Sequence, residues 1–112
     1  MARLPRCDLP EVARHVIQRG NDRRACFAAD VDHLQCGQAL GEAARRFGGA
    51  LHADVLMTNH VHLVITPAEA GAISRLVQAL GRCYAAGFKA RYRRTGTLWE
   101  GRFKAALVDS ER

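Results

Sequence analysis

Two histidines, His60 and His62, stand one residue apart inside an apolar run that extends from Val55 to Ile65. Side chains alternate between the two faces of a β-strand, so both imidazoles are expected on one face and Val61 on the other. Imidazole nitrogens bind divalent first-row metals, and two of them side by side on a strand predict a metal site. The spacing also leaves open a pair of half-exposed histidines without a ligand on a sheet surface.

The elements that must position this pair follow from periodicity and turn residues. Strands are expected at His15–Arg19, Ala50–Met57, His60–Thr66 and, through Trp99 and Phe103, up to Val108. Helices are expected from Asp30 or Asp32 to about Phe47, and from about Ala70 to Arg93. The order β-α-β-β-α-β predicts a ferredoxin-like α+β fold, with a four-stranded antiparallel sheet and both helices on one face. Residues 1–112 then form a single domain whose central third strand presents both histidines on the open face.

Apolar side chains predict the buried face of each element. The third strand turns Val61, Leu63 and Ile65 toward the helices. The apolar face of the second strand is expected at Leu51, Ala53, Val55 and Met57. That of the first helix is expected at Val31, Leu34, Leu40, Ala44 and Phe47. That of the long helix is expected at Ile73, Leu76, Val77, Leu80, Tyr84 and Phe88.

Composition narrows the class of protein. The 112 residues are 48% apolar and carry a net charge of +6, which favours a polyanionic partner, nucleic acid first and an anionic membrane second. A basic protein with no such partner is the other possibility. No run approaches the length of a membrane span, and the first ten residues do not resemble a signal peptide. The four cysteines form no CxxC pair, so we expect reduced thiols that pack in a cytoplasmic protein.

Cationic and aromatic side chains supply candidates for nucleic-acid contacts. A stripe of Arg75, Arg82, Lys89 and Arg93 on the long helix leads into Arg91, Arg94, Arg102 and Lys104, and it is either a solvated face or a phosphate-binding surface. Arg19 and Asn21 end the first strand and either touch DNA or serve the turn. Trp99 is either a core aromatic or a base-stacking platform. Gln18 faces either the metal or solvent, whereas His52 and Asp54 share a strand face as a surface pair or as supports for metal ligands. We expect His15 and His33 to be structural.

With these motifs placed, the chain resembles the single-tyrosine HUH transposases, in particular the group of REP-associated tyrosine transposases. The resemblance is carried by HVIQRGN at residues 15–21, LHADVLMTNHVHLV at 51–64 and YRRTGTLWEGRFK at 92–104. The stretches occur in the same order as in that family and cover nearly the whole chain. The resemblance implies an endonuclease and strand transferase for single-stranded DNA at hairpins, acting in DNA transposition and recombination through a 5′-phosphotyrosine link.

The resemblance also implies a cofactor and a nucleophile. His60 and His62 correspond to the ligands of Mg²⁺ or Mn²⁺, and ligand chemistry suggests that Mn²⁺ serves at least as well. In the family the tyrosine lies on a helix after the last strand, with a carboxamide ligand four residues later. This sequence ends at Arg112, where that helix would begin, so a truncated form without nucleophile and third ligand is expected. Tyr84 is expected to pack in the core and Tyr92 to contact a base or phosphate, with catalysis by either only a fallback.

Other functions compete with this one. A non-catalytic module that binds hairpin DNA would share the basic surface but tolerate alanine at both histidines. An RNA-recognition domain would place aromatics on its central strands, and the aromatic content of 6% counts against it. A membrane-surface protein would need an apolar helical face that the core already uses. Apolar surface left by a missing terminal helix predicts some dimerisation.

Overall fold

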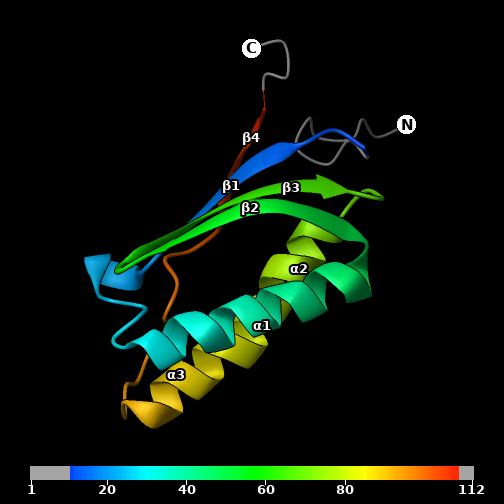
Figure 1. Cartoon of the computed structure of the whole chain (residues 1–112). Coiled ribbons are helices and arrows are strands. Elements are labelled where there is room, and N and C mark those ends of the chain that lie inside the picture. Colours follow the sequence, from blue (N-terminus) through cyan, green and yellow to red (C-terminus); the bar gives the residue numbers. More distant parts are fainter. Residues whose placement is uncertain (1–10, 109–112) are drawn as a thin grey trace.

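The computed structural model describes residues 11–108 and has the predicted ferredoxin-like α+β architecture. Its strands are β1 (Arg14–Arg19), β2 (Gly49–Met57), β3 (His60–Pro67) and β4 (Lys104–Leu107). Its helices are α1 (Asp30–Phe47), α2 (Ala72–Leu80) and α3 (Ala86–Arg91). The strands form one antiparallel sheet in the order β2-β3-β1-β4, and the helices cover one of its faces (Figure 1). The prediction that the third strand is central is therefore confirmed, and β1 is the other central strand.

The two central strands alternate strictly between the helical face and the open face. On β3, Val61, Leu63 and Ile65 are at most 2% exposed against the helices, whereas His60 and His62 are half-buried on the other side. This alternation confirms the expected orientation of the histidine pair. β1 pairs antiparallel with β3, which places Arg19 opposite His60 and Ile17 opposite His62. On the open face, histidine side chains of β3 thus lie next to an apolar and a cationic side chain of β1.

The expected apolar face of β2 is wrong because the strand contains a bulge. The register shifts between Leu51 and Ala53, so that Leu51 pairs with Ile65 whereas Val55 pairs with His62. A bulge adds one residue to a strand and reverses which side chains face the core beyond it. Leu51 and Leu56 consequently pack on the core, while Val55 and Met57 are 55% and 44% exposed on the open face.

Helix α1 has the predicted bounds but a different buried stripe. Leu40 and Ala44 are buried and Phe47 packs partly on the core, as expected, whereas Val31 and Leu34 are exposed. The side chains that face the core in the first two turns are Asp32 and Cys36. Gly48 ends the helix in the left-handed conformation, at a φ of 75°. Such a C-terminal position favours glycine because it has no Cβ.

The long second helix is continuous in space but not uniformly α-helical. A π-helical segment, Gly81–Ala85, separates α2 from α3, and the three together run from Ala72 to Arg91 rather than from Ala70 to Arg93. The predicted apolar stripe is confirmed, with its members buried except for the partly buried Val77. The segment places Tyr84 in the core, where its hydroxyl donates a 2.5 Å hydrogen bond to the Cys26 carbonyl.

The last strand, β4, lies at the edge of the sheet beside β1. β4 is shorter than expected, and Trp99 precedes it in an isolated bridge to Gly20.

Cys26 and Cys36 are buried, and burial raises the pKa of each thiol to about 12. With the exposed Cys83 they are free thiols, and Cys7 lies outside the described residues. Within residues 11–108, no helix is long and apolar enough to cross a bilayer.

Candidate functional site

Three histidines gather on the open face of the sheet, one more than the sequence predicts. The rings of His60 and His62 meet edge to face at 4.8 Å between centroids, and the ring of His15 on β1 stacks on His62 at 5.2 Å. His15 Nε2 lies 3.0 Å from His62 Nδ1, which is a hydrogen-bond distance. His60 Nδ1 lies 2.8 Å from Asn59 Oδ1 and therefore donates to it, which leaves His60 Nε2 for another partner.

The electrostatic surroundings favour a neutral His62. Burial, together with the nearby rings of His60 and His15 and the Arg19 guanidinium, lowers the pKa of His62 below its ordinary value. The neutral imidazole is the form that binds a metal, because only then does a ring nitrogen carry a free lone pair. His62 is therefore in the protonation state that ligation of a metal requires.

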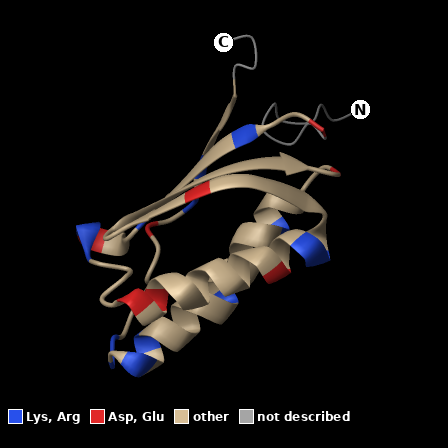
Figure 2. Cartoon of the chain, viewed as in Figure 1, with Lys and Arg blue, Asp and Glu red and all other residues tan. Residues whose placement is uncertain are grey.

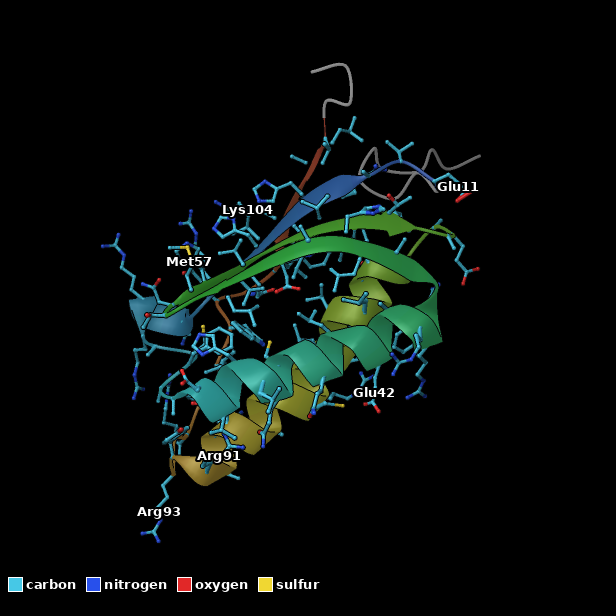
Figure 3. The ribbon with its side chains drawn as sticks, viewed as in Figure 1. Glu11, Glu42, Met57, Arg91, Arg93 and Lys104 are labelled. Carbon is cyan, nitrogen blue, oxygen red and sulfur yellow. The ribbon has the colours of Figure 1, made fainter. Side chains whose placement is uncertain are left out.

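A hollow of about 370 Å³ opens beside the histidine pair. Its lining residues are Ile17, Arg19, Gly20, Arg23, Asn59, His60, His62 and Glu100. A smaller one of about 30 Å³ adjoins it, bounded by Ile17, Arg19, Glu100, Arg102 and Lys104. Figure 3 shows Met57 and Lys104 on the side of the sheet away from the helices. The hollows therefore bring two imidazoles together with cationic side chains, an arrangement whose charge suits a phosphate group.

The cations predicted to contact DNA divide between two surfaces. Arg19, Arg102 and Lys104 lie at the hollows, and the partly buried Asn21 begins the 3-10 turn (Asn21–Arg23) that follows β1. The remaining predicted cations, Arg82, Lys89, Arg93 and Arg94, belong to the helical layer on the other side of the sheet or to the loop after it.

Some of the cations on the helical side already have partners. Lys89 donates to the Gly96 carbonyl at 3.0 Å, and Arg94 donates to the carbonyl of Ala25. Figure 3 shows Arg91 and Arg93 at the far end of the helices. The structure thus does not bring them to the histidine site.

Two of the open alternatives concern side chains that prove to be buried. Trp99 is 8% exposed and packs in the core, tilted against Tyr84 at 6.3 Å, so its indole has no free face for a base. Gln18 was expected on the metal side or in solvent. Instead it is 4% exposed on the helical face and donates to the Glu100 carbonyl at 3.3 Å. The expectation is wrong because Gln18 pairs with Val61, and paired residues share a face.

His52 and Asp54 do not share a face, contrary to expectation. Asp54 pairs with the buried Leu63, whereas His52 Nε2 lies 2.7 Å from Thr66 Oγ1 on the open face. The bulge between Leu51 and Ala53 accounts for the difference, because it changes the alternation at His52. Neither residue lines the hollow of about 370 Å³ beside the histidine pair, but Asp54 borders another hollow of about 270 Å³ together with His15 and His62.

The two tyrosines lie away from the histidines. Burial, followed by the charge of Asp32, raises the pKa of Tyr84 far above its ordinary value. Tyr92 donates a 2.8 Å hydrogen bond to Asp32, and that bond raises the pKa of its phenol. Both residues belong to the helical layer, and the histidines face away from that layer. Neither is thus positioned to attack a phosphate bound beside His60 and His62.

Among the described residues, the donor chemistry of two neighbouring imidazoles fits a divalent metal. His60 and His62 present imidazoles from one strand face, with Nδ1 of each at a hydrogen-bond distance from a neighbour. Between residues 11 and 108, no group of three His, Cys, Asp or Glu side chains is arranged to hold an ion. A metal at this site would therefore take its remaining ligands from water, from a substrate phosphate or from residues outside this range.

Sequence reasoning missed His15, Arg23 and Glu100 at the site. His15 was expected to be structural, and the register of β1 on β3 brings it beside His62. Arg23 belongs to a sharp turn in which Asp22 and Arg23 both have positive φ. The backbone amide of Glu100 donates a 2.7 Å hydrogen bond to the Arg19 carbonyl, and this bond holds Glu100 at the site. His15 begins the HVIQRGN stretch and Glu100 lies in the WEGR stretch, but nothing in either stretch shows that these residues meet.

Comparisons with known proteins agree with this fold. The chain matches the family described as IS200-like transposases over residues 9–112. A REP-associated tyrosine transposase bound to a REP hairpin has a similar structure, with a TM-score of 0.67 and 15% identity over 98% of this chain. A presumed transposase from Deinococcus radiodurans gives a TM-score of 0.69 and 21% identity, covering 98% of this chain and 88% of that one. The chain spans 64% of the length of the hairpin-bound transposase. No curated protein matches it significantly.

Proposed function

The chain belongs to the IS200-like transposase family, and from this premise we propose that it acts on single-stranded DNA at hairpins as part of a metal-assisted strand-transfer reaction. One observation carries the proposal. The open face joins a pair of adjacent imidazoles to a hollow bordered by Arg19 and Arg23, with Arg102 and Lys104 next to it. Such a surface suits a phosphodiester, which has both metal-binding oxygens and negative charge.

In this proposal His60 and His62 hold Mg²⁺ or Mn²⁺ through their Nε2 atoms. The ion, when bound, supplies a positive charge that polarises the scissile phosphate and stabilises the charge of its transition state. The protein's own side chains have separate tasks. Asn59 accepts from His60 Nδ1–H and so directs Nε2 away from the turn. Arg19 lies opposite His60 in the register and neutralises the phosphate backbone beside the reacting group.

The nucleophile of the family reaction is a tyrosine, and we propose that it is neither Tyr84 nor Tyr92. The raised pKa of each phenol makes it a weaker nucleophile at neutral pH, and each hydroxyl already donates a hydrogen bond in the helical layer. The tyrosine would then lie outside residues 1–112. A cytoplasmic location and a homodimer belong to the same proposal.

The experiment is a gel assay with a labelled hairpin oligonucleotide, with and without Mn²⁺. We expect the chain to bind the hairpin without forming a covalent adduct. The double variant His60→Ala/His62→Ala should keep its fold by circular dichroism and lose Mn²⁺ binding measured by calorimetry. A covalent protein–DNA band that disappears in Tyr92→Phe or Tyr84→Phe would contradict the assignment of the nucleophile. Absence of any hairpin binding would contradict the function itself.

A second candidate is a hairpin-binding module without catalysis. It is favoured by the observation that the part of the chain between residues 11 and 108 provides only a two-histidine set and no tyrosine near it. The two candidates differ in their response to metal. A purely binding module would bind the hairpin equally well with and without Mn²⁺, and His60→Ala/His62→Ala would leave its affinity unchanged.

A further inference from the structure

His15 occupies a position that its sequence neighbourhood does not explain. It lies on β1, paired with Val64 on one side and Ala106 on the other, and so is a diagonal neighbour of His62. Long side chains can meet across such a diagonal in an antiparallel sheet. The two rings lie nearly parallel, at an interplanar angle of 22° and 5.2 Å between centroids. The contact is therefore specific in orientation as well as in distance.

The 3.0 Å separation of His15 Nε2 and His62 Nδ1 requires one ring to donate and the other to accept. If His15 donates, His62 carries its proton on Nε2, and that nitrogen cannot bind a metal. If His62 Nδ1–H donates, the lone pair of His62 Nε2 is free. The second arrangement matches His60, whose Nδ1–H donates to Asn59 Oδ1.

We propose that His15 is a positioning residue that accepts a hydrogen bond from His62 Nδ1–H and thereby fixes the ring and tautomer in which His62 Nε2 can ligate a metal. The inference rests on the proposed function, since it assigns His15 a task within the same site. The two ligands are then held by two different acceptors, a carboxamide for His60 and an imidazole for His62. An acceptor at the second nitrogen also makes an imidazole a stronger ligand.

The ring stacking gives His15 a second effect on the same ligand. Since His15 is on a central strand with neighbours on both sides, its backbone is fixed by the sheet. The stacked ring restricts rotation of the His62 side chain, which lowers the entropy cost of ligation. A phenylalanine at position 15 would keep the stacking and remove the acceptor, and a glutamine would keep an acceptor without the ring.

Two measurements on the full chain test the proposal. Long-range ¹H–¹⁵N spectra of the imidazoles report the tautomer of His62 without any metal. We expect Nδ1–H in the wild type and a shift toward Nε2–H in His15→Phe. Calorimetry with Mn²⁺ should show a dissociation constant about tenfold higher for His15→Phe, the usual effect of losing such a partner. His15→Gln should bind Mn²⁺ nearly as the wild type does, and His52→Phe is the matched control for a histidine elsewhere on this face.

The outcomes separate this inference from the function on which it rests. A wild-type His62 in the Nε2–H tautomer would overturn the role of His15, as would wild-type Mn²⁺ affinity in His15→Phe. Nδ1–H in the wild type without any Mn²⁺ binding would support the hydrogen bond and overturn the metal site of the proposed function. If His15→Phe does not fold, the wild-type tautomer and the affinity of His15→Gln still decide between these results.

Discussion

At the residue scale, whether His60 and His62 can bind the proposed metal depends on which nitrogen of each ring carries a proton. Imidazole has two nitrogens, and a neutral ring offers a metal only the one without hydrogen. For His60 the answer follows from a neighbour in sequence, because Asn59 Oδ1 can only accept. The asparagine directly before the first histidine is therefore part of the site, although it is not itself a ligand.

This role of Asn59 leads to a prediction. Asn59→Ala should raise the dissociation constant for Mn²⁺ about tenfold, because His60 loses the acceptor that fixes its tautomer. Asn59→Asp keeps an oxygen at the same place and should retain most of the affinity. Calorimetric titration of both variants, with circular dichroism as a check on folding, measures the effect. Equal Mn²⁺ affinity in Asn59→Ala and the wild type would show that the turn, rather than the side chain, matters.

The sequence was sufficient to place His60 and His62 on one strand face and insufficient for their surroundings. His60 and His62 were predictable because a period of two is a local property of one strand. His15 and Gln18 were not, because the face that each presents depends on how β1 registers against β3. Gln18 shows this best. Its buried amide bonds to the Glu100 carbonyl, a contact between residues that are far apart in the chain.

At the scale of elements, a buried aspartate joins the start of α1 to the end of α3. Asp32 is fully buried, and Oδ2 accepts from the amides of Ala28 and Ala29, each at 2.9 Å, and from the Tyr92 hydroxyl at 2.8 Å. Oδ1 pairs with the Arg91 guanidinium. Burial alone would raise the pKa of this carboxyl, but these bonds outweigh it and hold the pKa below its ordinary value of 3.8.

The lowered pKa predicts how stability depends on acid. The unfolded chain binds a proton at Asp32 at a higher pH than the folded chain does. The contribution of Asp32 to the free energy of unfolding is therefore complete above about pH 4 and is lost as pH falls further. Asp32→Asn should lower the free energy of unfolding at neutral pH by about 1–3 kcal/mol and flatten its decline in acid.

Urea denaturation at several pH values checks this prediction. Glu42→Gln, an exposed change on the same helix, is the control and should alter the free energy of unfolding by less than about 0.5 kcal/mol. An acid dependence in Asp32→Asn as steep as that of the wild type would show that other groups cause it.

The same aspartate explains why the face of α1 was predicted wrongly. A pattern of apolar residues places Val31 and Leu34 inside, because a charged side chain is rarely buried. Asp32 is buried only because hydrogen-bond partners near the end of α3 and in the preceding loop offset the free-energy cost of burying its charge. No local sequence pattern reveals these partners. The bounds of α1 were nevertheless predictable, since Gly48 and the helical period are local signals.

At the scale of the whole molecule, the net charge of +6 is distributed over two faces. Cations on the open face border the histidine hollows, whereas those on the helices include several that bond to backbone or to Asp32. Figure 2 shows positive residues at both ends of the helical layer and beside the sheet. From the sequence these cations were expected to form one surface, because a charge pattern does not reveal which side of a sheet each residue occupies.

This division predicts that DNA binding depends on the open face. Arg19→Ala should weaken binding of a hairpin oligonucleotide about fivefold, and it should reduce the slope of log K against log salt by about 0.7–1, the value for one lost phosphate contact. Arg82→Ala removes the same charge from the helical side and should change neither quantity beyond the general effect of net charge. Arg45→Ala, an exposed change on α1, measures that general effect. Fluorescence anisotropy between 50 and 200 mM salt, roughly the range in which such contacts are strongly screened, gives both numbers. If Arg82→Ala loses affinity and slope while Arg19→Ala does not, DNA lies on the helices, and the histidine pair is not at its binding surface.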